Sequence, residues 1–433
     1  MTKKGSLKII YCYYYLVMLK FYGLFFRIFL SAGLIIVLLS CANNEERLKK
    51  EAEEIHKSIL TIDSHVDTPL MFSREGFDIG QRNEHGRLDF PRMKEGGLDA
   101  AFFAVFIGQG ESTPEGFEIA KRRAFSIFSQ IHEAVEKNAD QAGIALSPDD
   151  AYRLKNEGKS IVYIGIENGY PIGYDIELLK EFYNLGARYL GLCHSHNNHM
   201  CDSSSDSNGE LHGGLSEYGK EIIRELNRLG MLIDVSHMSD KSFYDVLKIT
   251  KAPIIASHSN ARALCDIDRN LDDDMLVALA ENGGVIQLCL LTVYVKTGTP
   301  NPQRDSAVAE LKRRYNNYEN LSDEQLHLMR QEWSSLNEKY PRELATVSDL
   351  VDHLDYIVRL IGIDHVGIGS DFDGGGQLDD CRDVSQMKNI TIELLRRGYS
   401  KHDIEKIWGG NFIRVFRSVE RISEEIRAAE LES

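Results

Sequence analysis

Eight apolar runs separated by helical or polar stretches constrain the fold of this chain more than any other feature. Each run has the length of a buried strand, and helix-period apolar positions recur between them. The runs cover residues 61–67, 96–108, 160–168, 187–198, 231–239, 252–260, 283–291 and 364–374. Strands that are apolar along their length belong to sheets covered on both faces, and alternation with helices makes the sheet parallel. Eight such units predict an α/β fold, a (β/α)8 barrel of the TIM type.

Residues 300–346 interrupt this alternation between the seventh and eighth runs. They are rich in Arg, Glu, Asn and Tyr and contain no apolar strand, so they predict a helical insertion. We expect the insertion to pack over the barrel mouth or to extend the outer ring of helices. The single barrel domain is expected to span residues 55–425, with a charged tail at 423–433 that frays. A doubly wound sheet is the alternative fold, but it would gather ligands at one crevice rather than at several strand ends.

Side chains suited to metal binding follow these apolar runs. They are His65, Asp67, Glu167, His194, His237, His258 and Asp371. In a barrel, the carboxyl ends of the strands converge on the active-site face, so these side chains should meet there. One catalytic zinc ion takes about three protein ligands and a water molecule, which is fewer than this set offers. Two metal ions that share a carboxylate account for the set better.

Five motifs around these residues resemble the membrane dipeptidase family, also called the renal dipeptidase family. They are HVD at 65–67, GIENG at 165–169, DVSH at 234–237, SHSNARALCDIDRN at 257–270 and HVGIGSDFDG at 365–374. The resemblance keeps the order of every motif from about residue 55 to about residue 420. It implies a zinc hydrolase with an amidohydrolase-like barrel and two zinc ions per chain.

The resemblance also implies which side chains hold the metal ions. His65 and Asp67 are expected to hold one zinc ion, and His237 and His258 are expected to hold the other. Glu167 is expected to bridge both ions. When bound, such ions polarise a peptide carbonyl and generate a nucleophile from water near neutral pH.

Three further residues match positions that act on the substrate in the family. His194 matches the histidine that contacts the developing oxyanion, and Asp371 matches the catalytic acid/base beside the first metal. Arg269 matches the arginine that receives the C-terminal carboxylate of the substrate, which its planar guanidinium can bind bidentately. Arg262 is a rival for that role, and a surface ion pair with residues 272–274 is the structural alternative for Arg269.

Other histidines lie close to these motifs or elsewhere along the chain. His196 and His199 are local rivals for the role of His194, but we expect them to be solvated loop residues because His194 ends the apolar run. His85, His212 and His353 have no strand-end context, and we expect them at the surface.

The leading functional prediction is a dizinc dipeptidase, and the resemblance implies tolerance of D-residues at the C-terminal position. One alternative keeps the fold and acts on N-acyl amino acids or cyclic amides. Amidohydrolases of that kind often use a carboxylated lysine as the bridge, where this chain has Glu167. The other alternative is a surface lipoprotein that only binds peptides or metal. Such a protein would not need Asp371 and His194 at the site.

Residues 1–41 predict an export signal with a lipid anchor. The segment carries five cations and no acid, and residues 29–40 are an uncharged run too short to span a bilayer as a helix. The sequence that ends at Cys41 resembles the bacterial lipoprotein cleavage box, so we expect lipidation of Cys41, followed by a tether over residues 42–54. An uncleaved signal anchor is the alternative, and Met18 competes with Met1 as the start. Both versions place the protein on a bacterial membrane, at its periplasmic or cell-surface face.

Charge and cysteine content exclude several classes of partner and site. The formal net charge of −16 argues against nucleic acid and against an anionic membrane surface as partners. The family resemblance implies dipeptide substrates as partners, and a homodimer is an open alternative to a monomer. The seven cysteines form no CxxC motif and no dense framework, so they predict neither a cysteine metal site nor a disulfide scaffold. A single disulfide is left open.

Overall fold

The computed structural model describes residues 13–15, 18, 22, 44–315, 321 and 323–432. The chain divides into two units, residues 1–54 and residues 55–433. Cys41 and most of the predicted signal lie outside the described residues. Residues 44–58 are helical, so a helix begins inside the segment predicted to be a tether. Within the described part of the chain, no helix has the length and apolar character needed to cross a membrane.

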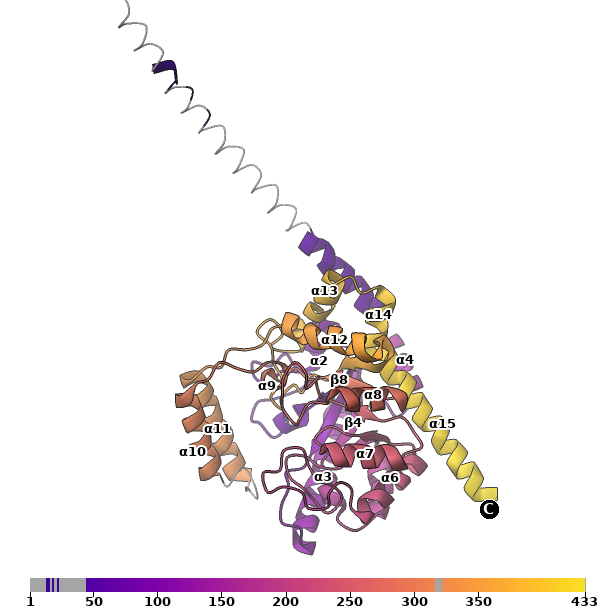
Figure 1. Cartoon of the computed structure of the whole chain (residues 1–433). Coiled ribbons are helices and arrows are strands. Elements are labelled where there is room, and N and C mark those ends of the chain that lie inside the picture. Colours follow the sequence, from indigo (N-terminus) through magenta and orange to yellow (C-terminus); the bar gives the residue numbers. More distant parts are fainter. Residues whose placement is uncertain are drawn as a thin grey trace, which may run out of the picture. The chain divides into compact units, whose positions relative to one another are not determined.

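Eight parallel strands form the predicted barrel (Figure 1). They are β1 (Ile62–Val66), β2 (Ala100–Phe106), β4 (Ser160–Glu167), β5 (Ala187–Gly191), β6 (Leu232–Asp234), β7 (Ile255–Ala256), β8 (Val285–Leu288) and β9 (Val366–Ile368). Each strand pairs with the next one in this order. A short strand that the sequence analysis missed, β3 (Ala142–Ile144), pairs with β4 outside this order. Three residues are too few for a periodic pattern, so the sequence carried no signal for β3.

The barrel closes between its first and last strands. Val66 and Phe372 form a parallel bridge, and the backbone N–H of Asp67 donates to the carbonyl of Phe372 at 2.7 Å. The backbone N–H of Asp371 donates to the carbonyl of His65 at 3.0 Å. These bonds tie the end of β1 directly to the segment after β9, so the backbones of His65, Asp67 and Asp371 are fixed relative to one another.

Aromatic rings fill the interior of the barrel below the strand ends. The ring of Phe102 stacks on Tyr163 and on Tyr189, with centroid distances of 4.6 and 5.3 Å. Gly165 leaves the space that Tyr189 occupies, because a Cβ at this position would lie 2.0 Å from Cζ of Tyr189. This packing leaves the polar side chains at the carboxyl ends of the strands as the upper layer of the barrel interior.

Most of the remaining helices cover the outside of the barrel. They are α2 (Phe90–Gly96), α3 (Pro114–Lys137), α4 (Pro148–Asn156), α5 (Glu177–Asn184), α6 (Glu217–Leu229), α7 (Asp240–Ile249), α8 (Asp273–Glu281), α9 (Thr292–Val295), α12 (Val347–Ile361), α13 (Lys388–Arg396), α14 (Lys401–Glu405) and α15 (Asn411–Glu432). Short turns of other types are η1 (Thr68–Met71), η2 (Tyr170–Ile172), η4 (Ile363–His365), η5 (Val384–Gln386) and the π-helical η6 (Lys406–Gly410).

Capping residues end α6 and begin α7. Helix α6 ends at Gly230, which has a left-handed φ of 80°, and the hydroxyl of Ser239 caps α7 by accepting from Ser242 N. Helix α15 continues to Glu432, so the tail that we expected to fray is helical.

The insertion consists of α10 (Pro302–Arg314) and α11 (Asp323–Lys339). The two helices bury Leu311, Tyr315 and Leu336 in a small cluster of their own. Figure 1 shows them side by side and set apart from the barrel. The helical insertion is confirmed, but both predicted positions for it are wrong, because its few apolar side chains are used within the pair.

Candidate active site

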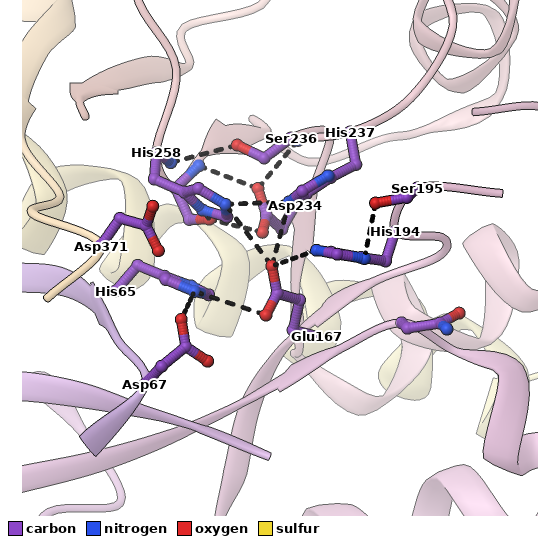
Figure 2. Close-up of polar contacts among 12 residues, drawn as sticks. His65, Asp67, Glu167, His194, Ser195, Asp234, Ser236, His237, His258 and Asp371 are labelled. Carbon is purple, nitrogen blue, oxygen red and sulfur yellow. Dashed lines mark hydrogen bonds and ion pairs between the residues drawn. The ribbon is translucent and has the colours of Figure 1, made fainter. Parts of the chain in front are cut away.

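The polar residues that end the strands meet at one point of the barrel (Figure 2). Three overlapping groups can each bring ligand atoms within 4.8 Å of one another, and together they contain His65, Asp67, Glu167, His194, His237, His258 and Asp371. Six of the seven side chains are buried, and His194 is partly exposed. The structure therefore brings together every residue that the sequence predicted for the metal site.

Glu167 lies at the centre of this arrangement, with its two oxygens turned to different sides. Its Oε1 is 3.0 Å from Nε2 of His237 and 3.5 Å from Nε2 of His258. Its Oε2 is 3.6 Å from Nε2 of His65, which is also 3.5 Å from Oδ2 of Asp67. A carboxylate placed between two groups of ligands in this way can serve both.

The spacing of the ligand atoms fits a tetrahedral cation on the His237 side. The Nε2 atoms of His237 and His258 are 3.0 Å apart, and each lies 3.0–3.5 Å from Glu167 Oε1. Ligands about 2.0–2.1 Å from a tetrahedral zinc ion are separated by about 3.3 Å. On the other side, His65 Nε2 and Asp67 Oδ1 are buried without a hydrogen-bond partner. Buried polar atoms without partners are costly unless another group binds them, so the residues fit metal ions.

Burial and charge set the protonation of these groups. Burial, assisted by the charge of Arg269, lowers the pKa of His258 well below its usual value, and burial does the same for His237. Burial opposes ionisation of Glu167, but the surrounding histidines hold its pKa well below the usual range. The pKa of His65 is raised well above its usual value, because the charges and hydrogen bonds around the ring outweigh burial. A proton therefore competes for Nε2 of His65, but not for the other two imidazoles at neutral pH.

Asp371 has the environment of an acid that can carry a proton. Burial raises its pKa well above the ordinary value, and the charge of Asp67 adds to the shift. Its Oδ2 lies 3.8 Å from the sulfur of Cys289, at the end of β8. A buried carboxylate with a raised pKa accepts a proton more readily than a free carboxylate does.

Backbone strain is concentrated at the same place. In the described part of the chain, the non-glycine residues with positive φ are Asn168 (76°), His237 (72°), Asp371 (61°) and Asp373 (68°). Such conformations cost about 1–3 kcal/mol each and persist only where the surroundings enforce them. Asn168 follows Glu167 directly, so three of the four lie at or beside residues of the site. Two of them, His237 and Asp371, carry side chains that belong to the cluster of candidate ligands.

His194 is the histidine of its loop that reaches the site. Its Nε2 is 3.8 Å from Glu167 Oε1, and its Nδ1 is 3.0 Å from the hydroxyl of Ser195. The rival His196 has its Nδ1 4.0 Å from Oδ2 of Asp206 instead. His199 is buried among Phe117, Tyr174 and Tyr218, so the expectation that it is solvated is wrong. Aromatic side chains from distant segments enclose it, and the local sequence gave no sign of them.

His353 also differs from its predicted surface position. It is 1% exposed, its Nδ1 accepts from the backbone N–H of Ala261, and its Nε2 lies 2.8 Å from the carbonyl of Val295. The cause is helix α12, which the sequence analysis did not recognise and which buries His353 on its inner face. His85 and His212 are exposed, as predicted.

Two arginines competed for the role of carboxylate receptor, and the structure gives them different environments. Arg262 is held by Asp240 and also lies 3.8 Å from Asp272. Arg269 is 5% exposed and donates to Ser259 Oγ and to the carbonyl of His258. Arg269 forms no ion pair with any residue that the structure describes. The surface ion pair considered for Arg269 is therefore formed by Arg262.

Hydroxyl groups that contact Nδ1 of His65 and His258 were not predicted from the sequence. The hydroxyl of Tyr189 lies 2.8 Å from Nδ1 of His65, and the hydroxyl of Ser257 lies 2.8 Å from Nδ1 of His258. Asp234 accepts a hydrogen bond from Ser257 Oγ at 2.6 Å. Asp234 and Ser257 lie inside two of the quoted motifs, so these motifs could have pointed to them. Tyr189 lies in an apolar strand that contains no such motif.

The cysteines that the structure describes form no disulfide bond. The cysteines between residues 44 and 432 are free and buried, and they are Cys193, Cys201, Cys265, Cys289 and Cys381. The single disulfide left open by the sequence is not formed among them.

The barrel and the buried His, Asp and Glu residues at its carboxyl ends define a metal-dependent hydrolase of the TIM-barrel kind. Residues 49–430 match the family model described as membrane dipeptidase, peptidase family M19. The chain therefore belongs to the membrane dipeptidase family, and it is a metallopeptidase of the dipeptidase class.

Individual relatives and solved structures agree with this family. Dipeptidase tcpJ of Claviceps purpurea is 32% identical over 343 residues, which cover 78% of this chain and 70% of the relative. Dipeptidase 3 of Homo sapiens is 30% identical over 391 residues, which cover 88% and 69%. The crystal structure of the probable dipeptidase PvdM from Pseudomonas aeruginosa is 34% identical with a TM-score of 0.76, and the match covers 87% of this chain and 99% of that one.

Proposed function

We propose that this protein is a dizinc dipeptidase that cleaves the peptide bond of dipeptides and accepts D-residues at the C-terminal position. The observation that carries the proposal is the position of Glu167, whose two oxygens face two separate groups of metal-binding side chains. A single-metal site would have no use for a carboxylate shared in this way.

Each of these two groups of side chains would bind one ion. His65 and Asp67 would hold one zinc ion, His237 and His258 would hold the other, and Glu167 would contribute an oxygen to each. Imidazole and carboxylate ligands without cysteine suit zinc among the common divalent metals. When bound, the two ions would polarise the scissile carbonyl and lower the pKa of water at the site.

Asp371 is proposed to carry the proton during turnover. Its carboxylate would accept the proton of the attacking water and then give it to the leaving amine. The raised pKa of Asp371 supports this role, because it makes the carboxylate a stronger proton acceptor than a free carboxylate. The closure bonds between β1 and the segment after β9 hold Asp371 beside His65 and Asp67.

His194 is proposed to stabilise the oxyanion that forms on the carbonyl carbon. Burial lowers the pKa of His194, so its ring is neutral at neutral pH. If Ser195 donates its hydroxyl proton to Nδ1, Nε2 carries the hydrogen and can donate to the oxyanion.

Arg269 is proposed to bind the free carboxylate of the substrate. Its guanidinium is buried, and its Nε has no hydrogen-bond partner among the described residues, so donor capacity remains available. A carboxylate held one residue beyond the scissile bond would limit the enzyme to dipeptides, since a longer peptide places its carboxylate too far away.

Acceptance of D-residues is proposed from the family. One solved metallopeptidase, from Rhodobacter sphaeroides, contains a phosphinate mimic of the dipeptide L-Ala-D-Ala. That structure is 22% identical to this chain with a TM-score of 0.67. We infer a similar tolerance here, because the two proteins share this fold.

We also propose that the protein is exported and anchored through a lipid on Cys41, on a bacterial membrane. This part of the proposal rests on the N-terminal sequence, because Cys41 lies outside the described residues.

A substrate panel tests the catalytic proposal. The zinc-loaded chain, residues 42–433, is mixed with L-Ala-L-Ala, L-Ala-D-Ala, N-acetyl-L-alanine and tri-L-alanine, and release of alanine is measured. We expect both dipeptides to be cleaved and the other two to be poor substrates. Preferential hydrolysis of N-acetyl-L-alanine would favour the amidohydrolase alternative. Absence of hydrolysis with retained zinc would favour a binding protein.

A further inference from the structure

Two of the metal-facing histidines are supported from behind by different hydroxyl groups. The ring nitrogen of His65 that faces away from Glu167 meets the phenol of Tyr189, and the corresponding nitrogen of His258 meets the hydroxyl of Ser257. Tyr189 lies within β5, whereas Ser257 directly follows β7, and the two hydroxyl groups share no hydrogen bond. Among the candidate metal ligands, the hydroxyl of Tyr189 contacts only His65 and the hydroxyl of Ser257 contacts only His258. The two imidazole rings themselves stack, with their centroids 3.9 Å apart.

Tyr189 is a rigid support for His65. Its ring is fully buried, stacks on Phe102, and occupies the space that Gly165 leaves in the neighbouring strand. Its oxygen lies 2.8 Å from Nδ1 of His65. When Nδ1–H donates to this oxygen, Nε2 keeps its lone pair and points it toward Glu167 and Asp67.

Ser257 supports His258 through a second and longer connection. The carboxylate of Asp234 accepts from the backbone N–H groups of Ser236 and Ser257, and also lies 2.6 Å from Ser257 Oγ. A carboxylate accepts, so the hydroxyl of Ser257 donates to Asp234. Its oxygen is then left to accept from Nδ1–H of His258 at 2.8 Å. The lone pair of Nε2 is thereby directed at Glu167 Oε1 and at Nε2 of His237.

We propose that Tyr189 and Ser257 are positioning residues that orient the two metal positions separately. Tyr189 acts on the position of His65 and Asp67, whereas Ser257, held by Asp234, acts on the position of His237 and His258. This inference rests on the proposed dizinc function. Removal of either hydroxyl should weaken one zinc ion and spare the other.

The zinc affinity of the protein, residues 42–433, tests the proposal without reference to activity. The metal-free protein is titrated with zinc in competition with a chromophoric chelator, which yields two dissociation constants. Loss of a group that orients a metal-binding histidine costs about 10–100-fold in affinity. We expect Tyr189→Phe to weaken one ion by this factor and Ser257→Ala to weaken the other. The unaffected ion should keep its affinity within about twofold.

The same substitutions made in a His65→Ala variant show which of the two metal positions each hydroxyl affects. His65→Ala removes the first position, so adding Tyr189→Phe to it should not change the affinity of the remaining ion. Adding Ser257→Ala to His65→Ala should still weaken that ion. Ser257→Thr retains the hydroxyl and should restore most of the affinity lost in Ser257→Ala.

Matched controls come from the same barrel. Tyr163→Phe removes a hydroxyl that donates to the carbonyl of Ser147, from a ring that stacks on Phe102 as Tyr189 does. Ser160→Ala removes a buried hydroxyl that has no hydrogen-bond partner. Both controls should leave the two dissociation constants unchanged.

The tautomer of the His258 imidazole can be measured in the absence of zinc. In metal-free protein labelled with 15N-histidine, His258 should carry its proton on Nδ1, and Ser257→Ala should produce a mixture of tautomers. Equal weakening of both ions by each variant, or no weakening beyond the controls, would overturn the inference while leaving the dizinc proposal intact. A parent protein that binds fewer than two zinc ions would overturn both.

Discussion

Arg262 donates two hydrogen bonds to the carboxylate of Asp240, from Nη1 to Oδ2 at 2.8 Å and from Nη2 to Oδ1 at 2.6 Å. This pairing occupies the edge of the planar guanidinium, whose two parallel N–H groups bind a carboxylate. Arg262 is therefore already used within the protein, and Arg269 is the arginine near the histidines that can receive a substrate carboxylate. The first prediction separates these two residues.

Arg269→Ala should mainly raise KM for dipeptides. A charged bidentate pair contributes about 1.5–3 kcal/mol, so the expected increase is on the order of 10–100-fold. Steady-state kinetics with a dipeptide and with its C-terminal amide provide the comparison, because the amide lacks the carboxylate. The amide should be a poor substrate for the parent and about equally poor for the variant.

Arg262→Ala is the matched control for that experiment. It should lower stability modestly and leave the ratio of acid to amide turnover unchanged, because Arg262 pairs with Asp240 and donates to the backbone carbonyls of Asp268 and Asn270. If Arg269→Ala instead reduces turnover of acid and amide by the same factor, Arg269 has a structural role.

Asp371→Asn should keep both zinc ions and lose turnover. General acid–base catalysis is typically worth about 10²–10⁴-fold, so kcat should fall by a factor in this range. Zinc content of the purified variant is measured together with kcat. Loss of one ion from the variant would show that Asp371 is a metal ligand and not a proton carrier.

The two zinc positions should respond differently to acid. The raised pKa of His65 means that a proton competes with zinc at Nε2 below that pKa, so affinity there falls by up to about tenfold for each pH unit of acidification. The lowered pKa values of His237 and His258 remove this competition near neutral pH. Dialysis from pH 8 to pH 6, followed by metal analysis, should therefore release one ion first. The His65→Ala variant, which lacks that position, should release no ion over the same range, and simultaneous release of both ions from the parent would contradict the assignment.

Cys41→Ala should prevent lipidation and leave an uncleaved precursor. Membrane fractionation and mass spectrometry of the N-terminus test this, with Cys12→Ala as a control because Cys12 lies upstream of the expected cleavage point. A mature start at another residue, without lipid, would rule out the anchor.

The barrel and the cluster of candidate metal ligands could be predicted because both depend on patterns that are local in sequence. Each apolar run is recognisable on its own, and the rule that parallel strand ends converge then places His65, Glu167 and His258 together. The assignment of His194 over His196 followed from the same rule, since His194 comes first after the apolar run of β5.

The parts that could not be predicted depend on contacts between distant segments. His199 and His353 are buried by aromatic rings or by a helix that no local pattern around them announces. The left-handed backbone of His237 and Asp371 has no sequence signal, because residues other than glycine adopt it only where tertiary structure enforces it. The support of His65 by Tyr189 likewise requires the register between β1 and β5 around the closed barrel.

Activity as a function of added zinc tests the central claim most directly. Metal-free protein, residues 42–433, receives increasing equivalents of zinc, and hydrolysis of L-Ala-L-Ala is followed at each step. The account predicts that activity rises until two equivalents per chain are present and then stays constant. A plateau at one equivalent, or dipeptide hydrolysis that does not depend on zinc, would contradict it.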